Sequence, residues 1–345
     1  IYPNEIYQKT NWNLKTEKGV LDVMVFLMRE TPFAFPKEKE VEAMEDPRDR
    51  ATFVSTIVAI FNMLQQCAIC GVFTTAQLSC VLDILFTHAF AHESDSVRVQ
   101  GMKTGEALME KYGEQNKQEL LSYLNLRMAS MEKDVGTEEE MIKQDHMREG
   151  CVVLLGKATC FLEDGDSRIF STTETLLNSL SIPAASVQEA VARCLTPLFK
   201  YECLRKNAKT YVDRLLTQLT QGDTYAERRG AAIGLAGAIK GMSSKAFKEY
   251  GINEFIEKAG QSDSPLAREG AMLILEALFD TLTFMFEPYV VRFLPLLLEN
   301  FSYKDEGVRE AAKGASRSVM RNLSPHGVKL VMPKVLEGLT DSRWR

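Results

Sequence analysis

The sequence contains few of the residue types on which enzyme chemistry most often depends. Among 345 residues there are only four histidines, and none lies beside a nucleophile in a pattern typical of general-base activation. Paired carboxylates occur only in charged loops, where a solvated surface is their usual setting. These absences favour a protein that is not an enzyme and that needs no cofactor or small-molecule substrate.

Other scarce features narrow the class of protein further. We see no apolar run near the length of a membrane-spanning helix and no signal peptide, so we expect no membrane contact. The net charge of −6 disfavours a protein that coats nucleic acid along its whole surface. The first residue is Ile1 and the chain stops just inside an expected helix, which predicts an internal piece of a longer protein.

Seven cysteines are present, an odd number, and most of them lie in apolar stretches with helical spacing. This pattern predicts free thiols in the core of a cytoplasmic protein. Cys67-x-x-Cys70 followed by His88 and His92 invites comparison with a zinc finger. However, 17 residues separate Cys70 from His88 where about 12 are typical, and the intervening stretch has helical spacing. We therefore favour core cysteines and surface histidines, with no metal.

Two glycine patterns resemble nucleotide-binding motifs without matching them. Gly150 and Gly156-Lys157 are separated by five residues instead of four, and Ala158 stands where a hydroxyl would bind magnesium. The residues between the two glycines are apolar and predict a helix, which excludes a flexible phosphate loop. A second series of glycines at 230, 234, 237 and 241 has the spacing of one helix face, which predicts close helix packing.

One pattern recurs along the chain at a nearly constant interval. The steps between its first residues are 40, 40, 40 and 41, and each copy opens an apolar run with i, i+4, i+8 spacing. Such a period with two helices per repeat is typical of HEAT arrays, so we expect an all-α solenoid, a right-handed superhelix of antiparallel helix pairs. The copies are Arg148-Glu149-Gly150, Gln188-Glu189-Ala190, Arg228-Arg229-Gly230, Arg268-Glu269-Gly270 and Arg309-Glu310-Ala311.

The repeat predicts how the whole chain is organised. We expect residues 1–345 to form one continuous array of about seven units and a truncated eighth, with partner helices at 74–90, 116–129, 167–180, 207–220, 245–258, 286–301 and 325–339. Long loops are expected near 30–50 and 131–142, where charge, proline or glycine accumulates.

The arginines that recur at the repeat starts are best interpreted as a structural ladder. In this interpretation each arginine near a helix start reaches an aspartate or a backbone carbonyl of its own or the next unit. Regularity along a rod supports this architectural role. The ladder consists of Arg98, Arg148, Arg228, Arg268 and Arg309.

A local excess of positive charge is the strongest indication of a binding surface. Residues 200–250 carry ten basic and five acidic side chains although the chain as a whole is acidic. Such an excess fits RNA phosphates or an acidic protein, and the alternative is a solvated basic face. The candidate contact residues are Arg205, Lys206, Lys209, Arg228, Arg229, Lys240, Lys245 and Lys248.

The C-terminal third also resembles a known family. The resemblance is carried by Arg228–Gly241, Phe286–Leu297, Val308–Ala312, Asn322–Pro333 and Trp344-Arg345. These stretches are similar to the Gcn-one family of translational activators, ribosome-bound HEAT solenoids that activate the kinase of initiation factor 2 alpha when ribosomes stall or amino acids run short. The specific match covers about 225–345, whereas the earlier residues fit only as generic repeats.

The resemblance implies a non-catalytic scaffold segment that lies along the ribosome in the cytoplasm. It also implies that the regulatory kinase and co-activator proteins bind other parts of the full-length protein. Two alternatives remain open at this point: a nuclear transport receptor of the importin type, and the HEAT region of a protein similar to elongation factor 3.

Overall fold

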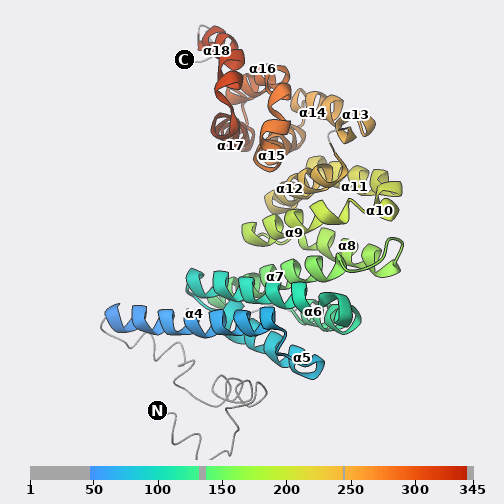
Figure 1. Cartoon of the computed structure of the whole chain (residues 1–345). Helices are drawn as coiled ribbons and strands as arrows, with labels where there is room; N and C mark the ends of the chain where they lie inside the picture. Colours follow the sequence, from blue (N-terminus) through green and yellow to red (C-terminus); the bar gives the residue numbers. More distant parts are fainter. Residues whose placement is uncertain (1–46, 132–136, 244, 340–345) are drawn as a thin grey trace, which may run out of the picture. The chain divides into compact units, whose positions relative to one another are not determined.

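The computed structural model describes residues 47–131, 137–243 and 245–339, and every regular element in these ranges is helical (Figure 1). The all-α prediction is therefore confirmed. The chain divides into two compact units, residues 1–161 and 162–345. The expected continuity of one array across this boundary stays a prediction, as does the number of repeats.

The first unit is built around one long helix. This helix, α6, packs on α4 and α7 and is kinked at Asn116, whose φ of −118° and ψ of 22° are not helical. The predicted helix 116–129 is thus the second half of α6. The elements of this unit are α4 (Pro47–Cys70), α5 (Thr75–Ile84), the π-helix η1 (Leu85–Phe90), α6 (Asp95–Ser130) and α7 (Glu138–Thr159).

The second unit contains the regular repeats. Its helices pack in successive pairs, α8 with α9, α11 with α12, α14 with α15 and α16 with α17. Its elements are α8 (Ser167–Ser179), α9 (Ala185–Leu198), α10 (Glu202–Lys206), α11 (Ala208–Gln221), α12 (Tyr225–Met242), α13 (Ala246–Glu249), α14 (Ile252–Gly260), α15 (Pro265–Leu282), η2 (Thr283–Met285), η3 (Glu287–Tyr289), α16 (Val290–Phe301), α17 (Glu306–Asn322) and α18 (Pro325–Leu339).

The second helix of each pair begins at the same place relative to the repeat. In α9, α12, α15 and α17 the repeat residue lies three positions after the first helical residue. Polar side chains cap three of these starts: Thr224 accepts from the Glu227 N–H, Ser264 from the Ala267 N–H, and Asp305 from the Val308 N–H. The α9 helix has Ala184 at this position and no side-chain cap. The recurring motif is therefore the first turn of a helix, with a polar cap in front of it in α12, α15 and α17.

The apolar residues predicted to face the core do so. Leu195, Leu235, Ile274 and Ala315 each expose none of their surface, and the second column is buried from Leu198 to Val319. Met320 is the exception, because 56% of its surface is exposed. The helix pairs thus bury the stripe that their spacing predicted.

The glycine series of α12 brings two helices unusually close together. A Cβ added at Gly237 would lie 2.5 Å from the Ala192 carbonyl oxygen of α9, and one at Gly241 would meet the carbonyl of Thr196. In addition, the Thr196 hydroxyl donates to the Gly237 carbonyl at 3.1 Å. The prediction of close helix packing is confirmed. Likewise, Gly150 and Gly156 lie inside α7, so the near match to a phosphate loop is a helix.

Several sequence-based boundaries were wrong. Residues 138–142, expected in a loop, belong to α7, which begins at Glu138 and is capped by Thr137 accepting from the Glu140 N–H; residues 132–136 lie outside the described residues. Likewise, α4 begins at Pro47, inside the loop expected near 30–50, most of which lies outside the described residues.

The expectation about apolar runs was also wrong. Residues 50–70 of α4 have a mean hydropathy of 1.7 and are long and apolar enough, by length and composition alone, to cross a membrane. This helix nevertheless makes polar contacts with another helix. The Thr104 hydroxyl of α6 donates to the Phe61 carbonyl at 2.9 Å, and Gln100 donates to Gln65 at 2.8 Å.

The prediction of core thiols holds for two cysteines only. Cys151 and Cys194 are buried, whereas Cys70 and Cys160 are exposed and the remaining three are half-buried. The α4 helix ends at Cys70, so this side chain lies beside a turn instead of inside the core. Within the described ranges no three His, Cys, Asp or Glu side chains are grouped so that they could hold a metal ion.

Candidate partner-binding surface

The repeat arginines share one hydrogen-bonding geometry. Arg98, Arg228, Arg268 and Arg309 each donate to the backbone carbonyl six residues earlier, at 2.8, 2.8, 2.6 and 2.9 Å. These carbonyls lie in the turn before the arginine's own helix, and at helix ends backbone carbonyls lack partners within the helix. Each arginine therefore ties a turn to the helix that follows it.

Arg148 departs from this pattern, and at one further repeat position a glutamine keeps it. Arg148 reaches back to the Met131 carbonyl and pairs with Asp145 at 3.0 Å. In α9 the arginine is replaced by Gln188, whose amide lies 2.9 Å from the carbonyls of Leu180 and Ile182. Sequence reasoning did not give Gln188 this role, although its place in the repeat was the available signal.

Arg228 has to be removed from the candidate contact residues. Its guanidinium lies 2.8 Å from the Glu269 carboxylate of α15, and the two side chains are only 7% and 9% exposed. A side chain held in this way cannot reach a partner molecule. Arg228 and Arg229 are adjacent in the sequence, and only the packing of α15 against α12 determined which of the two side chains is buried.

Six of the remaining seven candidates are exposed and lie in the connections between helix pairs or in the helix turns next to them. Arg205 and Lys206 are in α10, Lys209 is in the first turn of α11, Lys240 is near the end of α12, and Lys245 and Lys248 flank or belong to α13. Both short helices, α10 and α13, lie on the same side of the second unit (Figure 1). The seventh, Arg229, is half-buried and bonds Gln188 at 2.7 Å and Glu189 at 3.4 Å.

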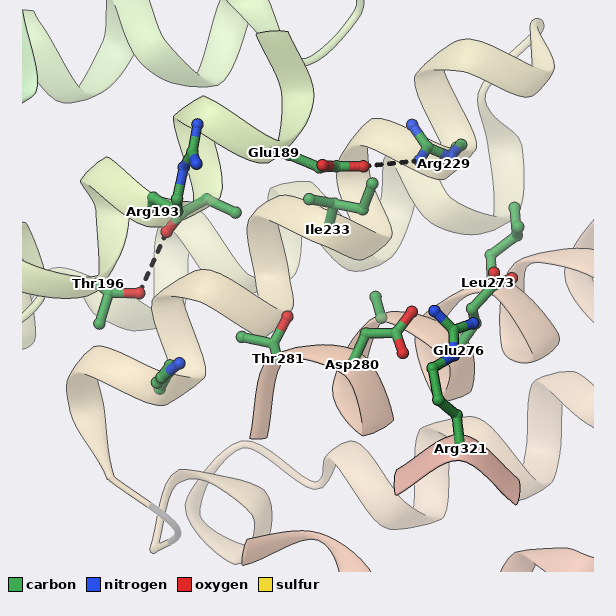
Figure 2. Close-up of a pocket in the computed structure, with 13 residues that line it drawn as sticks. Glu189, Arg193, Thr196, Arg229, Ile233, Leu273, Glu276, Asp280, Thr281 and Arg321 are labelled. Atoms are coloured by element: carbon green, nitrogen blue, oxygen red, sulfur yellow. Dashed lines mark hydrogen bonds and ion pairs between the residues drawn. The ribbon is translucent and has the colours of Figure 1, made fainter. Parts of the chain in front are cut away.

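A groove of about 440 Å³ crosses α9, α12 and α15 (Figure 2). Arg229, Ile233 and Lys240 line it from α12, at positions that a helix places on one face. The opposite side comes mainly from α15, with Arg321 of α17 reaching toward it. The remaining lining residues are Glu189, Ala192, Arg193, Thr196, Leu273, Glu276, Ala277, Asp280 and Thr281.

Charges of both signs meet in this groove. The pKa of Glu276 is raised because the carboxyl is partly desolvated and lies near Asp280, while Arg229, Arg321 and Arg317 oppose the shift. Asp280 accepts a hydrogen bond from the Asn322 amide at 3.0 Å. Such a surface suits recognition of a charged partner, and we find in it no nucleophile with a neighbouring base.

Comparisons with known proteins agree with this architecture. Residues 228–345 match the family described as EF3 N-terminal HEAT repeat. Protein ILITYHIA of Arabidopsis thaliana is 39% identical over 279 residues, which cover 79% of this chain and 10% of that protein. The stalled ribosome sensor GCN1 of Homo sapiens is 41% identical over 202 residues, 58% of this chain and 8% of that protein.

The eIF-2-alpha kinase activator GCN1 of Dictyostelium discoideum is 32% identical over 271 residues, 77% of this chain and 10% of that protein. The similarity therefore extends well beyond residues 225–345, the limits expected from the sequence. The chain spans about a tenth of the length of these curated relatives.

Among solved structures, a mutant of Kap121p has a similar fold over 94% of this chain and 40% of the Kap121p chain, with 12% sequence identity and a TM-score of 0.40. At this level of similarity the match supports no conclusion about function.

Proposed function

We propose that this chain, which belongs to the GCN1 family of HEAT-repeat proteins, is a scaffold segment through which a translational regulator lies along the ribosome. In this role the segment would help to hold the full-length protein in place while other parts of it engage the regulatory kinase and its co-activators. The observation that carries the proposal is the similarity to relatives named as a stalled ribosome sensor and as an eIF-2-alpha kinase activator.

The exposed cations on α10 and α11 are the part of this segment that best suits ribosomal RNA. Arg205, Lys206 and Lys209 lie within five residues of one another, and Lys206 pairs with Glu202 at 3.0 Å and lies near Asp164. Backbone phosphates attract such a cluster without requiring a particular sequence, and their contribution falls as salt concentration rises.

The proposal is tested by ribosome cosedimentation of the full-length protein. Reversing Arg205, Lys206 and Lys209 to Glu should reduce the bound fraction, most clearly at low salt. The matched control reverses Lys103, Lys111 and Lys258, which are also exposed but lie outside α10 and α11. Equal loss in both variants would assign the effect to net charge, and unchanged binding in the first would remove α10 and α11 from the contact.

We also infer that the segment acts in the cytoplasm and has no catalytic activity of its own. Its relatives are named as a sensor and an activator, and the described side chains form no nucleophile–base pair that we can recognise. If the segment is a scaffold, deleting it from the full-length protein should reduce kinase activation in cells, and the purified segment should show no catalytic activity of its own.

A second candidate function is that of the HEAT region of an elongation factor 3-like protein. The match of residues 228–345 to the EF3 N-terminal HEAT repeat favours it. This role and the first one share ribosome binding, so they differ in what the rest of the protein does. ATP hydrolysis by the purified full-length protein, stimulated by ribosomes, would favour the second role.

A further inference from the structure

The α4 helix ends with two cysteines in its last turn. Cys67 and Cys70 are three residues apart, and they are close enough for the charge of Cys70 to raise the pKa of Cys67. Both are free thiols. Residues at this spacing in an α-helix have Cα atoms about 5 Å apart, within the range of about 4.4 to 6.8 Å that disulfides bridge. The helix therefore holds the two residues at a separation that a disulfide can span.

The cap at the end of α4 depends on the backbone of Cys67. Gly71 has a φ of 76°, and its N–H donates to the Ala68 carbonyl at 3.0 Å. The Val72 N–H donates to the Cys67 carbonyl at 3.1 Å. This pair of bonds belongs to the capping motif in which a left-handed glycine ends a helix. The path of the chain after Cys70 is thus fixed by where the Cys67 carbonyl lies.

The residue after this cap joins α4 to α6. The Phe73 N–H donates to the Tyr112 hydroxyl at 2.8 Å, and both residues are buried. The pKa of Tyr112 is raised by burial and, more weakly, by the charge of Cys67, while the bond from Phe73 opposes the shift. Cys67 therefore lies near the contact through which the end of α4 is held on α6.

The two thiols differ in their access to solvent and in their environment. Cys70 is exposed, so a dissolved oxidant reaches it directly. Cys67 is half-buried, and burial raises its pKa, with a further contribution from Cys70. A thiol with a raised pKa holds less of the nucleophilic thiolate at neutral pH. Cys70 is therefore the thiol that reacts first, with Cys67 as its nearest partner.

We propose that Cys67 and Cys70 form a redox modification site, which hydrogen peroxide closes to a disulfide that loosens the end of α4 from α6. The Cys70 thiolate attacks one peroxide oxygen and the O–O bond breaks, which leaves a sulfenic acid on Cys70 and releases water. The Cys67 thiolate then attacks the Cys70 sulfur and the S–O bond breaks. The departing hydroxide takes up the proton that Cys67 released and leaves as a second water. Each sulfur loses one electron, and the peroxide gains two.

Closing the disulfide changes the shape of the last turn. Side chains three residues apart on a helix have Cβ atoms about 5–6 Å apart, whereas a disulfide requires about 3.5–4.5 Å. The turn must tighten, and the Cys67 carbonyl then shifts relative to the Val72 N–H. We expect the hydrogen bonds of the Val72 and Phe73 N–H groups to weaken as a result. Glutathione should reverse the change by thiol–disulfide exchange.

The chemical test treats the reduced 345-residue chain with hydrogen peroxide and then blocks the remaining thiols with iodoacetamide. Mass spectrometry of a digest should show that Cys67 and Cys70 both escape alkylation, and that glutathione restores alkylation of both. In Cys70→Ser, Cys67 should be fully alkylated, and Cys67→Ser should abolish the disulfide likewise. The matched control is Cys80→Ser, which removes the nearest other cysteine in the sequence and should leave the result unchanged.

The structural test is hydrogen exchange of the same samples. The Val72 and Phe73 amides should exchange faster after peroxide treatment, and α15 and α17 of the second unit should keep their rates as an internal reference. In Cys70→Ser, which changes an exposed side chain only, peroxide should leave the two amides unaffected.

Four results would overturn the proposal. Complete alkylation of both cysteines after peroxide would show that no bond forms. Protection of Cys70 that persists in Cys67→Ser and disappears in Cys80→Ser would place the bond in α5. A dimer on a non-reducing gel that Cys70→Ser removes would make it a bond between two copies. Unchanged exchange at Val72 and Phe73 in the oxidised chain would remove the effect on α6. Ribosome cosedimentation tests only the proposed function, so its failure would leave this inference unaffected.

Discussion

Arg228 of α12 and Glu269 of α15 form an ion pair with 2.8 Å between nitrogen and oxygen, and both side chains are more than nine-tenths buried. The adjacent residue, Arg229, pairs with Glu189 of α9 at 3.4 Å, and 61% of that glutamate side chain is exposed. Two consecutive arginines of one helix thus connect it to the helices on both sides. The two pairs differ in burial and should therefore differ in energy.

Removing the buried carboxylate should be strongly destabilising. In Glu269→Gln, Arg228 keeps its carbonyl contacts but loses the negative charge of its ion-pair partner, at an expected cost of about 3 kcal/mol. In Glu189→Gln, the matched change at the exposed pair, we expect about 0.5 kcal/mol. Urea unfolding of both variants measures the difference. Similar costs at the two positions would contradict a dominant role for desolvation.

Close packing of α12 on α9 should not tolerate a methyl group. In Gly237→Ala the new Cβ would lie 2.5 Å from the Ala192 carbonyl oxygen and 2.8 Å from its Cα, so backbone must move. We expect a loss of about 2 kcal/mol. The control is Gly307→Ala in α17, where the nearest atom is a carboxylate oxygen of Asp305 at 3.2 Å. That variant should lie within about 1 kcal/mol of the parent. Equal thermal midpoints for the two variants would be the contrary result.

An unpaired charge in the seam between repeats should act locally. Leu275 is fully buried in α15, and Leu275→Asp should cost about 4 kcal/mol. Because an array of repeats gains its stability from each unit and its neighbours, hydrogen exchange should accelerate first in α12, α15 and α17. The helices α4, α6 and α7 of the first compact unit should keep their protection. A uniform change along the chain would contradict this view of the stability.

Glu276 should make the second unit less stable as pH rises. Its pKa is raised above 4.5 by burial and by Asp280, so the folded state binds the proton more tightly than the unfolded state does. The resulting penalty is absent below pH 4.5 and is complete above the folded pKa. Glu276→Gln should therefore be more stable than the parent at pH 7 and equal to it at low pH.

The control for this prediction has the opposite sign. The pKa of Glu287 is lowered, first by hydrogen bonds from the Ser324 side chain and backbone. Its contribution to stability is present above pH 4.5 and is lost as pH falls through the lowered pKa. Glu287→Gln should thus be less stable than the parent at pH 7. Thermal unfolding of both variants between pH 3 and pH 7 gives the comparison, and a shift of the same sign in both would contradict the assignments.

The local sequence pattern predicted most of the helix positions in the repeats but not which side chains of those helices are exposed. The helix starts near Gln188, Arg228, Arg268 and Arg309 were predictable because an apolar stripe, and in the last three a polar cap, are properties of neighbouring residues. The burial of Arg228 and the exposure of Met320 were not predictable. The burial of Arg228 depends on Glu269, which lies on another helix about forty residues later in the sequence.

Boundaries between helices were less predictable than the helices themselves. Asn116 interrupts α6 without ending it, since its amide donates to the Tyr112 carbonyl at 3.1 Å and its oxygen accepts from the Thr75 hydroxyl of α5 at 2.9 Å. The second of these contacts joins residues far apart in the sequence. A pattern confined to residues near 116 therefore could not distinguish one kinked helix from two.

The sequence by itself determined the repeated helix pair, because helical spacing, capping and small residues act within a few turns of chain. Only the tertiary structure decided which charges remain at the surface. Arg228 is paired with Glu269 and buried, whereas Lys245 and Lys248 stay exposed, and this follows from how separate repeats pack. Electrostatic and apolar contacts between repeats depend on distances in space, which adjacent positions in the chain do not specify.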